Sequence, residues 1–213
     1  MRTKLVVMYG GPGEEHGVSV NSGKNVISGI DTEKYELHTI FVDKKGGWIL
    51  DGKERDLKKI LKEIKDYLVW SVVHGTYGED GKLQKILEGK KIKFIGTGST
   101  ASKVTMSKDG TQKILEKNKI RYPNGIVLKK YKEELGLHYP VIAKPDEGGS
   151  SFGLYKFENG KEYSKKIKSV LTADNIEWHP ISYTKQPPVL STIYDVFRIK
   201  KLAFSLHQKN NFS

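Results

Sequence analysis

The segment KLVVMYGGPGEEHGVSVNSG (residues 4–23) decides the fold of the N-terminal half of this chain. After Lys4 it begins with a continuous apolar run, which is typical of a strand buried on both faces of a parallel sheet. Glycines end the run, and residues 17–30 then carry apolar side chains at helical spacing. A strand, a glycine-rich turn and a helix in this order predict the first unit of an α/β fold.

The same alternation continues to about residue 100. We predict strands over residues 36–42, 67–73 and 92–95, an edge hairpin over 46–50, and helices over 56–66 and around 83–87. The expected N-terminal domain, residues 1–100, is therefore an open, mostly parallel sheet with flanking helices. In such sheets ligands bind outside the carboxyl ends of the strands, which draws attention to the glycine-rich segments after Tyr9 and Val73.

A second, α+β unit is expected over residues 101–171. It contains a predicted helix over 102–118, a strand over 139–145 that leads into a small-residue loop, and a helix over 161–171. Beyond residue 171 the periodicity fades, and no element is predicted before the 193–206 region.

Composition narrows the classes of function. The chain has 37 Lys+Arg against 25 Asp+Glu, a net charge of +12, and no cysteine, which excludes disulfides, thiolate metal sites and cysteine nucleophiles. The positive charge is spread along the chain and 33 of the 37 cations are lysine, whereas base readout favours arginine. No apolar stretch is long enough for a membrane span. We therefore expect a cytoplasmic protein that binds neither nucleic acid nor membrane, although a nucleotide substrate would suit its charge.

Two segments at the predicted strand ends have competing interpretations. The glycines of residues 10–17 lack Gly-x-Gly-x-x-Gly spacing, so a dinucleotide fingerprint and a tight strand–helix turn are both open. Glu15 either favours the helix dipole or binds a substrate ammonium group. His74 precedes a turn with three glycines and two acids, HGTYGEDG, where a structural and a functional histidine are equally expected.

The third glycine-rich segment is KPDEGGSSFG, residues 144–153. A lysine that ends a strand, followed by a loop of small residues, suits a nucleotide phosphate, because the strand supplies a cation and the loop supplies backbone N–H groups. The segment is not a Walker A loop, since Lys144 precedes the glycines. The alternative is an ordinary turn with a surface lysine.

Taken together, four blocks resemble the D-alanine–D-alanine ligases of the ATP-grasp superfamily. They are GGPGEEHGVSVNSG (10–23), HGTYGEDGKLQKILE (74–88), FIGTGSTASKVTMSK (94–108) and YPVIAKPDEGGSSFG (139–153). The resemblance covers residues 1 to about 170, with Gly17 standing where relatives usually carry a second acid. It implies a ligase that uses ATP and Mg²⁺ to phosphorylate one D-alanine and then joins it to a second, for peptidoglycan synthesis. It also implies that residues 101–171 are the small subdomain of the ATP-grasp fold.

The resemblance also implies roles for individual residues. Glu15 and Ser150 are the expected catalytic residues, and Glu15, Ser19 and His74 are expected to bind the first D-alanine. The expected ATP-binding residues are Lys108, Lys144, Gly149, Ser151 and Gly153. Family members are often dimers, so a homodimer is a further expectation.

The family pattern is not found after about residue 171. Glu177-Trp178-His179 does not match the adenine-binding hinge, and Asp195-Val196-Phe197-Arg198 lacks the downstream Glu-x-Asn that ligates Mg²⁺ in relatives. We therefore predict no metal ligands, a largely missing C-terminal half of the ATP-grasp fold, and a tail over 172–213 produced by truncation, frameshift or divergence. The alternative function is a D-alanine- and nucleotide-binding remnant without catalysis.

Overall fold

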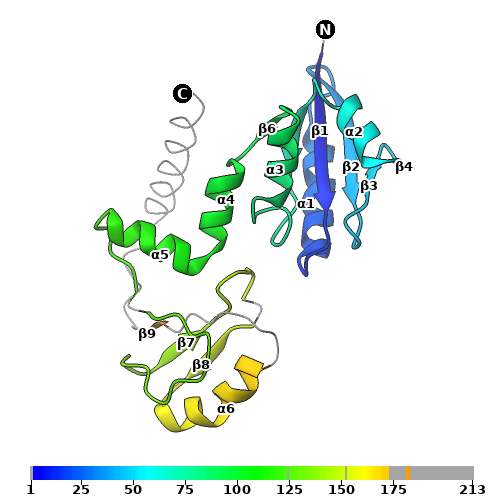
Figure 1. Cartoon of the computed structure of the whole chain (residues 1–213). Helices are drawn as coiled ribbons and strands as arrows, with labels where there is room; N and C mark the ends of the chain where they lie inside the picture. Colours follow the sequence, from blue (N-terminus) through cyan, green and yellow to red (C-terminus); the bar gives the residue numbers. More distant parts are fainter. Residues whose placement is uncertain (1, 124, 152, 173–180, 183–213) are drawn as a thin grey trace. The chain divides into compact units, whose positions relative to one another are not determined.

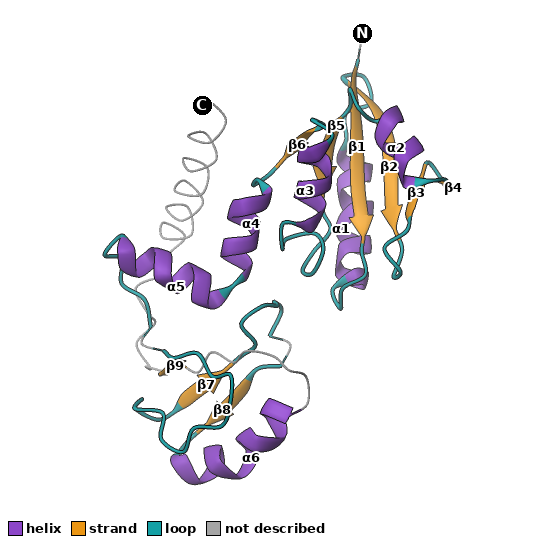
Figure 2. Cartoon of the chain, viewed as in Figure 1, coloured by secondary structure: helices purple, strands orange, loops and turns teal. Residues whose placement is uncertain are grey.

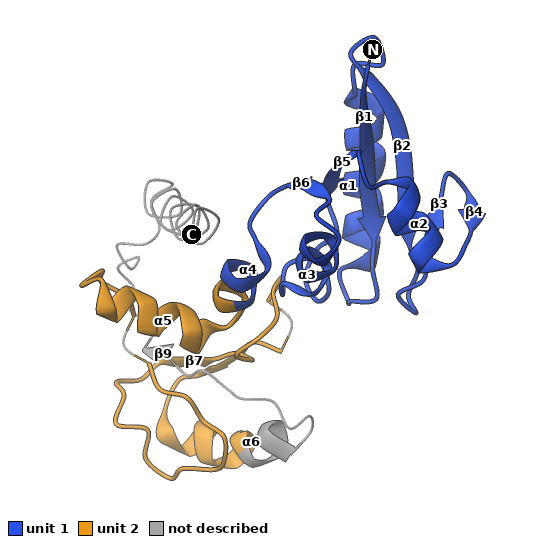
Figure 3. Cartoon of the chain, turned by 45° about the horizontal axis from the view of Figure 1, so that its top comes forward, with its two compact units in different colours: residues 1–103, 209–213 blue, residues 104–208 orange. Residues whose placement is uncertain are grey.

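The computed structural model of the chain describes residues 2–123, 125–151, 153–172 and 181–182 (Figures 1 and 2). These residues divide into two compact units, one up to Lys103 and one from Val104 onward (Figure 3). Residues 177–179, 193–206 and most of the predicted tail lie outside the described residues.

The first unit is built on a six-stranded sheet. Its strands are β1 (Thr3–Gly10), β2 (Tyr35–Val42), β3 (Trp48–Leu50), β4 (Lys53–Glu54), β5 (Leu68–Ser71) and β6 (Lys93–Ile95), in the order β4-β3-β2-β1-β5-β6. β1 runs parallel to β2 and β5, and β5 runs parallel to β6, while β3 and β4 form an antiparallel edge. The helices are α1 (His16–Gly29), α2 (Leu57–Glu63) and α3 (Lys82–Gly89), and α4 (Ser99–Met106) contains the boundary between the two units. The predicted parallel α/β sheet is confirmed.

The apolar run in β1 explains why this strand is central. Leu5, Val6, Val7 and Met8 are all 2% exposed or less, so both faces of the strand are covered. In register, Leu5 lies between Leu37 of β2 and Leu68 of β5. The core formed around β1 draws on β1, β2, β3, β5, α2 and α3, and Phe94 of β6 packs against it. Its buried residues include Val6, Met8, Ile40, Val42, Trp48, Leu50, Ile60, Leu61, Val69, Leu83 and Leu87.

The second unit contains α5 (Lys108–Lys117) and a small antiparallel sheet. The sheet has the order β8-β7-β9, from β7 (Val141–Ala143), β8 (Tyr155–Phe157) and β9 (Ile181–Ser182). Helix α6 (Gly160–Thr172) packs on β8, and Phe157, Tyr163 and Ile167 are fully buried there. The Tyr163 ring meets Phe157 edge-on, with centroids 5.6 Å apart, and its hydroxyl donates to the Lys132 carbonyl oxygen at 2.7 Å.

The helix predicted over residues 102–118 is wrong as a single element. It is two helices, α4 and α5, separated at Ser107, whose backbone is extended (φ −78°, ψ 124°). The Ser107 hydroxyl accepts a hydrogen bond from the Gly110 amide at 2.9 Å and so caps the N-terminus of α5. The apolar residues keep a helical spacing across Ser107, so their periodicity does not reveal that one helix ends and another begins there.

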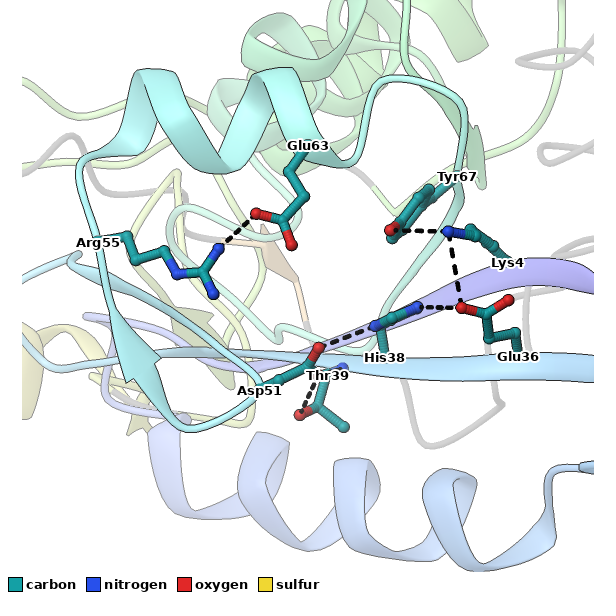
Figure 4. A network of polar contacts seen from close by, with 8 residues as sticks. All are labelled: Lys4, Glu36, His38, Thr39, Asp51, Arg55, Glu63 and Tyr67. Carbon is teal, nitrogen blue, oxygen red and sulfur yellow. Dashed lines mark hydrogen bonds and ion pairs between the residues drawn. The ribbon is translucent and has the colours of Figure 1, made fainter.

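A network of polar side chains lies on the first sheet near the start of β1 and β2 (Figure 4). His38 on β2 lies between Asp51, 2.8 Å from Nδ1, and Glu36, 3.3 Å from Nε2. Asp51 follows β3 and also accepts from the Thr39 amide at 2.8 Å. The Tyr67 ring lies 4.8 Å from that of His38 and under the Lys4 ammonium. The network therefore joins β1, β2, the β3–β4 turn and the segment before β5.

Loss of the Asp51 charge should destabilise the protein in a pH-dependent way. Partial burial raises the pKa of the Asp51 carboxyl, but hydrogen bonds from His38 and Thr39 outweigh it and leave the pKa below its usual value. A depressed folded-state pKa gives stability that is present above the unfolded pKa of about 3.9 and is lost as pH falls through the folded value. At pH 7 we expect Asp51→Asn to lower the melting temperature by about 2–4 °C.

The difference in melting temperature should shrink as pH falls from about 5 towards 3. Scanning calorimetry of both proteins across this range measures it. Asp66→Asn, at an exposed position of the same unit, is the control. A constant difference between the wild type and Asp51→Asn at all pH values would contradict the assignment.

Candidate functional site

The first part of the candidate site lies where β1 ends. Gly10 and Gly11 both have left-handed backbones (φ 93° and 106°), and the Gly11 amide donates to the Val42 carbonyl oxygen at 2.7 Å. A Cβ atom on Gly10 would lie 2.3 Å from that same oxygen, so only glycine fits. The turn therefore runs close over the end of β2 before the chain enters α1. This confirms the tight strand–helix turn and gives it a steric reason.

Glu15 stands at the N-cap position of α1 and its side chain is nearly buried, at 9% exposure. Its carboxylate lies against Gly75, where an added Cβ would come within 2.7 Å of Oε2. Gly75 follows β5, the strand next to β1, so the parallel sheet brings these two segments together. A carboxylate held here with little water around it is suited to a small ammonium ligand.

His74 is held from two sides. Its Nε2 atom lies 2.9 Å from the Ser22 hydroxyl on α1, and Nδ1 lies 3.7 Å from Glu79 Oε1. The other oxygen of Glu79 accepts from the Gly75 amide at 3.2 Å. The imidazole is thereby fixed in orientation while about a third of its side chain remains exposed. A fixed and accessible ring favours the functional interpretation of His74 over a buried structural one.

The loop that carries His74 is anchored to the core behind it. Tyr77 has a left-handed backbone (φ 78°), and its hydroxyl accepts from the indole nitrogen of Trp48 at 2.8 Å. Burial, together with the Asp80 charge, raises the pKa of Tyr77 against the effect of that bond, so the phenol stays protonated at neutral pH. Asp80 accepts from the amides of Tyr77 and Lys82. These contacts give the loop one conformation.

Ser19, which is expected to bind the first D-alanine, lies inside the protein. It is fully buried, and its hydroxyl accepts from the Gly10 amide at 2.9 Å and donates to the Val72 carbonyl oxygen at 2.6 Å. The hydroxyl therefore joins α1 to the ends of β1 and β5. Its direct role in substrate binding stays a prediction, but the contacts make Ser19 a support for the segments that carry Glu15 and His74.

The second part of the candidate site belongs to the second unit. Lys144 directly follows β7 and is half-buried, and this burial lowers its pKa. Lys108 begins α5, and its pKa is lowered by burial and then by the charge of Lys144, while the charges of Asp146 and Glu147 act in the opposite direction. The charge of Lys144 thus acts on Lys108, and the two ammonium groups form a local concentration of positive charge.

The loop after Lys144 has an unusual backbone. Gly148 and Gly153 have positive φ values, and so do the non-glycine residues Ser150 (φ 49°) and Ser151 (φ 62°). Together with Gly149, these residues are exposed. Consecutive left-handed residues turn backbone N–H groups to one side of a loop, an arrangement that suits anions. The loop and both lysines thus lie in one unit.

The structure therefore groups the predicted residues into two sets. Glu15, Ser19 and His74 share one edge of the first sheet. Lys108, Lys144, Gly149, Ser150, Ser151 and Gly153 belong to the second unit. The contact between the Ser22 hydroxyl and His74 was not predicted, and no sequence pattern indicates it, since the two residues are 52 positions apart.

Among the residues that the structure describes, no three His, Asp or Glu side chains are clustered so as to hold a metal ion. The described carboxylates do not fit a Mg²⁺ site, and Asp195 lies outside them. In the same part of the chain, every helix falls short of the length and apolar character needed to cross a membrane.

Comparison with known proteins bears on these two sets. Residues 4–67 match the family model for the D-Ala–D-Ala ligase N-terminus. The chain is 28% identical to a D-alanine–D-alanine ligase of Oceanobacillus iheyensis, over 82% of this chain and 59% of that protein. It is 32% identical to D-alanine–D-alanine ligase B of Clostridium tetani, over 81% of this chain and 56% of that protein.

Solved structures agree. The VanG D-Ala:D-Ser ligase from Enterococcus faecalis superposes with a TM-score of 0.71 at 26% identity, over 86% of this chain and 63% of that one. A D-alanine–D-alanine ligase from Bacillus anthracis complexed with ATP gives a TM-score of 0.69 at 26% identity, over 86% and 59%. The predicted resemblance is confirmed, and the chain spans less than two thirds of the length of these relatives.

The two hydrogen bonds of Ser19 predict a large cost for its removal. Ser19→Ala would leave a buried amide of Gly10 and the carbonyl of Val72 without this partner, so we expect the free energy of unfolding to fall by about 2 kcal/mol. Urea denaturation measures the change. Ser28→Ala, on the exposed part of the same helix, should change it by less than about 0.5 kcal/mol. Equal effects of the two substitutions would contradict the role given to Ser19.

Proposed function

We propose that this protein works as an ATP-dependent D-alanine–D-alanine ligase for peptidoglycan precursor synthesis. In the first step the γ-phosphoryl group of ATP passes to a carboxylate oxygen of one D-alanine, giving an acylphosphate and ADP. The amine of a second D-alanine then attacks the acyl carbon, loses a proton, and inorganic phosphate leaves. Because ATP is the co-substrate, we place the reaction in the cytoplasm.

One observation carries the proposal more than any other: the Glu15 carboxylate lies against Gly75, the neighbour of His74, beyond the ends of two adjacent parallel strands and within motifs resembling those of the ligases. The near-buried carboxylate of Glu15 would bind the ammonium group of the first D-alanine. His74, fixed by Ser22 and Glu79, would orient that substrate. Ser150 is proposed to act on the same substrate, and Ser19 to support the site.

The nucleotide phosphates are assigned to the second unit. Lys144 and Lys108 would neutralise phosphate oxygens, and the loop residues Gly149, Ser151 and Gly153 would donate backbone N–H groups. Partial burial strengthens the attraction between each ammonium group and a phosphate oxygen, because the local dielectric constant is lower than in water. ATP and D-alanine are therefore the proposed ligands. When bound, Mg²⁺ would neutralise part of the phosphate charge; the described residues form no cluster to hold it.

An alternative with the same binding chemistry is a protein that binds D-alanine and ATP without catalysis. Titration calorimetry with each ligand, followed by a phosphate-release assay with ATP, D-alanine and Mg²⁺, separates the two. We expect saturable binding of both ligands, and phosphate release above the blank if the chain is a ligase. Binding without release would favour the alternative, and no binding would contradict both.

Removal of one charge should locate the D-alanine site. Glu15→Gln keeps the shape of the side chain but loses the charge that would hold the substrate ammonium, so we expect the affinity for D-alanine to fall about 10-fold to 100-fold. Titration calorimetry measures it. The neighbouring Glu14 is exposed, and Glu14→Gln should leave the affinity unchanged. Equal losses for both variants would indicate a long-range charge effect instead of a site at Glu15.

A further inference from the structure

Asp146 holds the start of the small-residue loop against the first turn of α5. Its Oδ2 atom accepts from the Ser107 hydroxyl at 2.7 Å, and its Oδ1 atom accepts from the Asp109 amide at 2.7 Å. Ser107 is also the N-cap of this helix. Both carboxylate oxygens are therefore committed to one helix end, where a negative charge is favoured by the helix dipole.

The backbone of Asp146 makes a second connection, to Lys108. Its carbonyl oxygen accepts from the Lys108 amide at 3.1 Å and from the Lys108 ammonium at 3.0 Å. The same ammonium donates to the Gly148 carbonyl oxygen at 3.1 Å. The Lys108 ammonium thus lies beside the first residues of the loop, and its position depends on where the Asp146 carbonyl is held.

This arrangement leaves the ammonium able to serve a ligand. A lysine ammonium has three N–H donors in a fixed tetrahedral arrangement, and these two carbonyl contacts direct the third. Lys144 lies two residues before Asp146, joined to it through Pro145, whose ring restricts the backbone. One short segment therefore sets the positions of both half-buried lysines.

We propose that Asp146 is a positioning residue for nucleotide phosphate binding. Through its carboxylate on the N-terminus of α5 and its carbonyl on Lys108, it holds the Lys108 ammonium beside Lys144 at the entrance of the loop. This inference rests on the proposed function, since it takes the polyphosphate of ATP as the ligand.

Whether Asp146→Asn raises or lowers the affinity for ATP separates a positioning role from a purely electrostatic one. A carboxylate close to a phosphate site repels the ligand, so if Asp146 acted only through its charge, Asp146→Asn would bind ATP more tightly. If Asp146 acts by holding Lys108, the same substitution weakens the hydrogen bonds to Ser107 and Asp109. We then expect the affinity for ATP to fall about tenfold.

A double-mutant cycle tests whether the effect passes through Lys108. The affinity for ATP with Mg²⁺ is measured by titration calorimetry for the wild type, Asp146→Asn, Lys108→Met and the double variant. Once Lys108 is replaced, we expect Asp146→Asn to lower the affinity for ATP by less than about twofold, because the effects of substitutions at residues that act through one another are not additive. Glu133→Gln, at an exposed acid of the same unit, should leave the affinity unchanged.

Each remaining outcome overturns a defined part of this inference. Unchanged or tighter binding by Asp146→Asn, or equal losses with and without Lys108, would exclude a positioning role while the proposed function stands. If the wild type does not bind ATP, or Lys144→Met binds it as the wild type does, the proposed function fails and this inference fails with it. Should Asp146→Asn not fold, Ser107→Ala replaces it in the cycle, with an expected loss of about threefold.

Discussion

The hydroxyl of Ser19 is the contact on which the candidate site of the first unit depends. It lies inside the protein and bonds the end of β1 through the Gly10 amide and the end of β5 through the Val72 carbonyl. Parallel strands bring their carboxyl ends to one edge of a sheet but leave the segments that follow them free to diverge. By tying both segments to the first turns of α1, Ser19 keeps Glu15 close to Gly75. Serine suits this position because its hydroxyl supplies both an acceptor and a donor in a small volume.

The second unit meets the same requirement with a carboxylate. A glycine-rich loop cannot hold its own conformation, since glycine loses much conformational entropy on folding. Asp146 fixes the start of the loop on α5, and the break between α4 and α5 is what exposes the amides that it binds. The helix break, the cap and the loop anchor are therefore parts of one local structure, in which Ser107 contributes to all three.

Much of the fold could be predicted from the sequence because its signals are local. The apolar run of residues 5–8, the glycines after it and the helical spacing that follows all act within a few residues, and β1 and α1 form where expected. The apolar spacing carries no trace of the break at Ser107, because the break comes from a capping hydrogen bond to the Gly110 amide and from a contact with Asp146, 39 residues away. The same holds for Ser22 and His74, 52 residues apart. Side-chain contacts to distant segments leave no periodic trace, and the residues beyond 182 lie outside the described structure.

The two half-buried lysines give the charge of the chain a more specific meaning. A net charge of +12 spread over many lysines is compatible with an ordinary solvated surface. Lys108 and Lys144 differ from such surface lysines, because burial lowers the pKa of both and the charge of Lys144 lowers the pKa of Lys108 further. Carbonyl oxygens of Asp146 and Gly148 offset part of this cost at Lys108. A bound anion would offset the rest, and it would also return both pKa values towards normal. A fold that holds two cations together in its free state has therefore arranged in advance the charge that a polyphosphate requires, which reduces the reorganisation needed when the ligand binds.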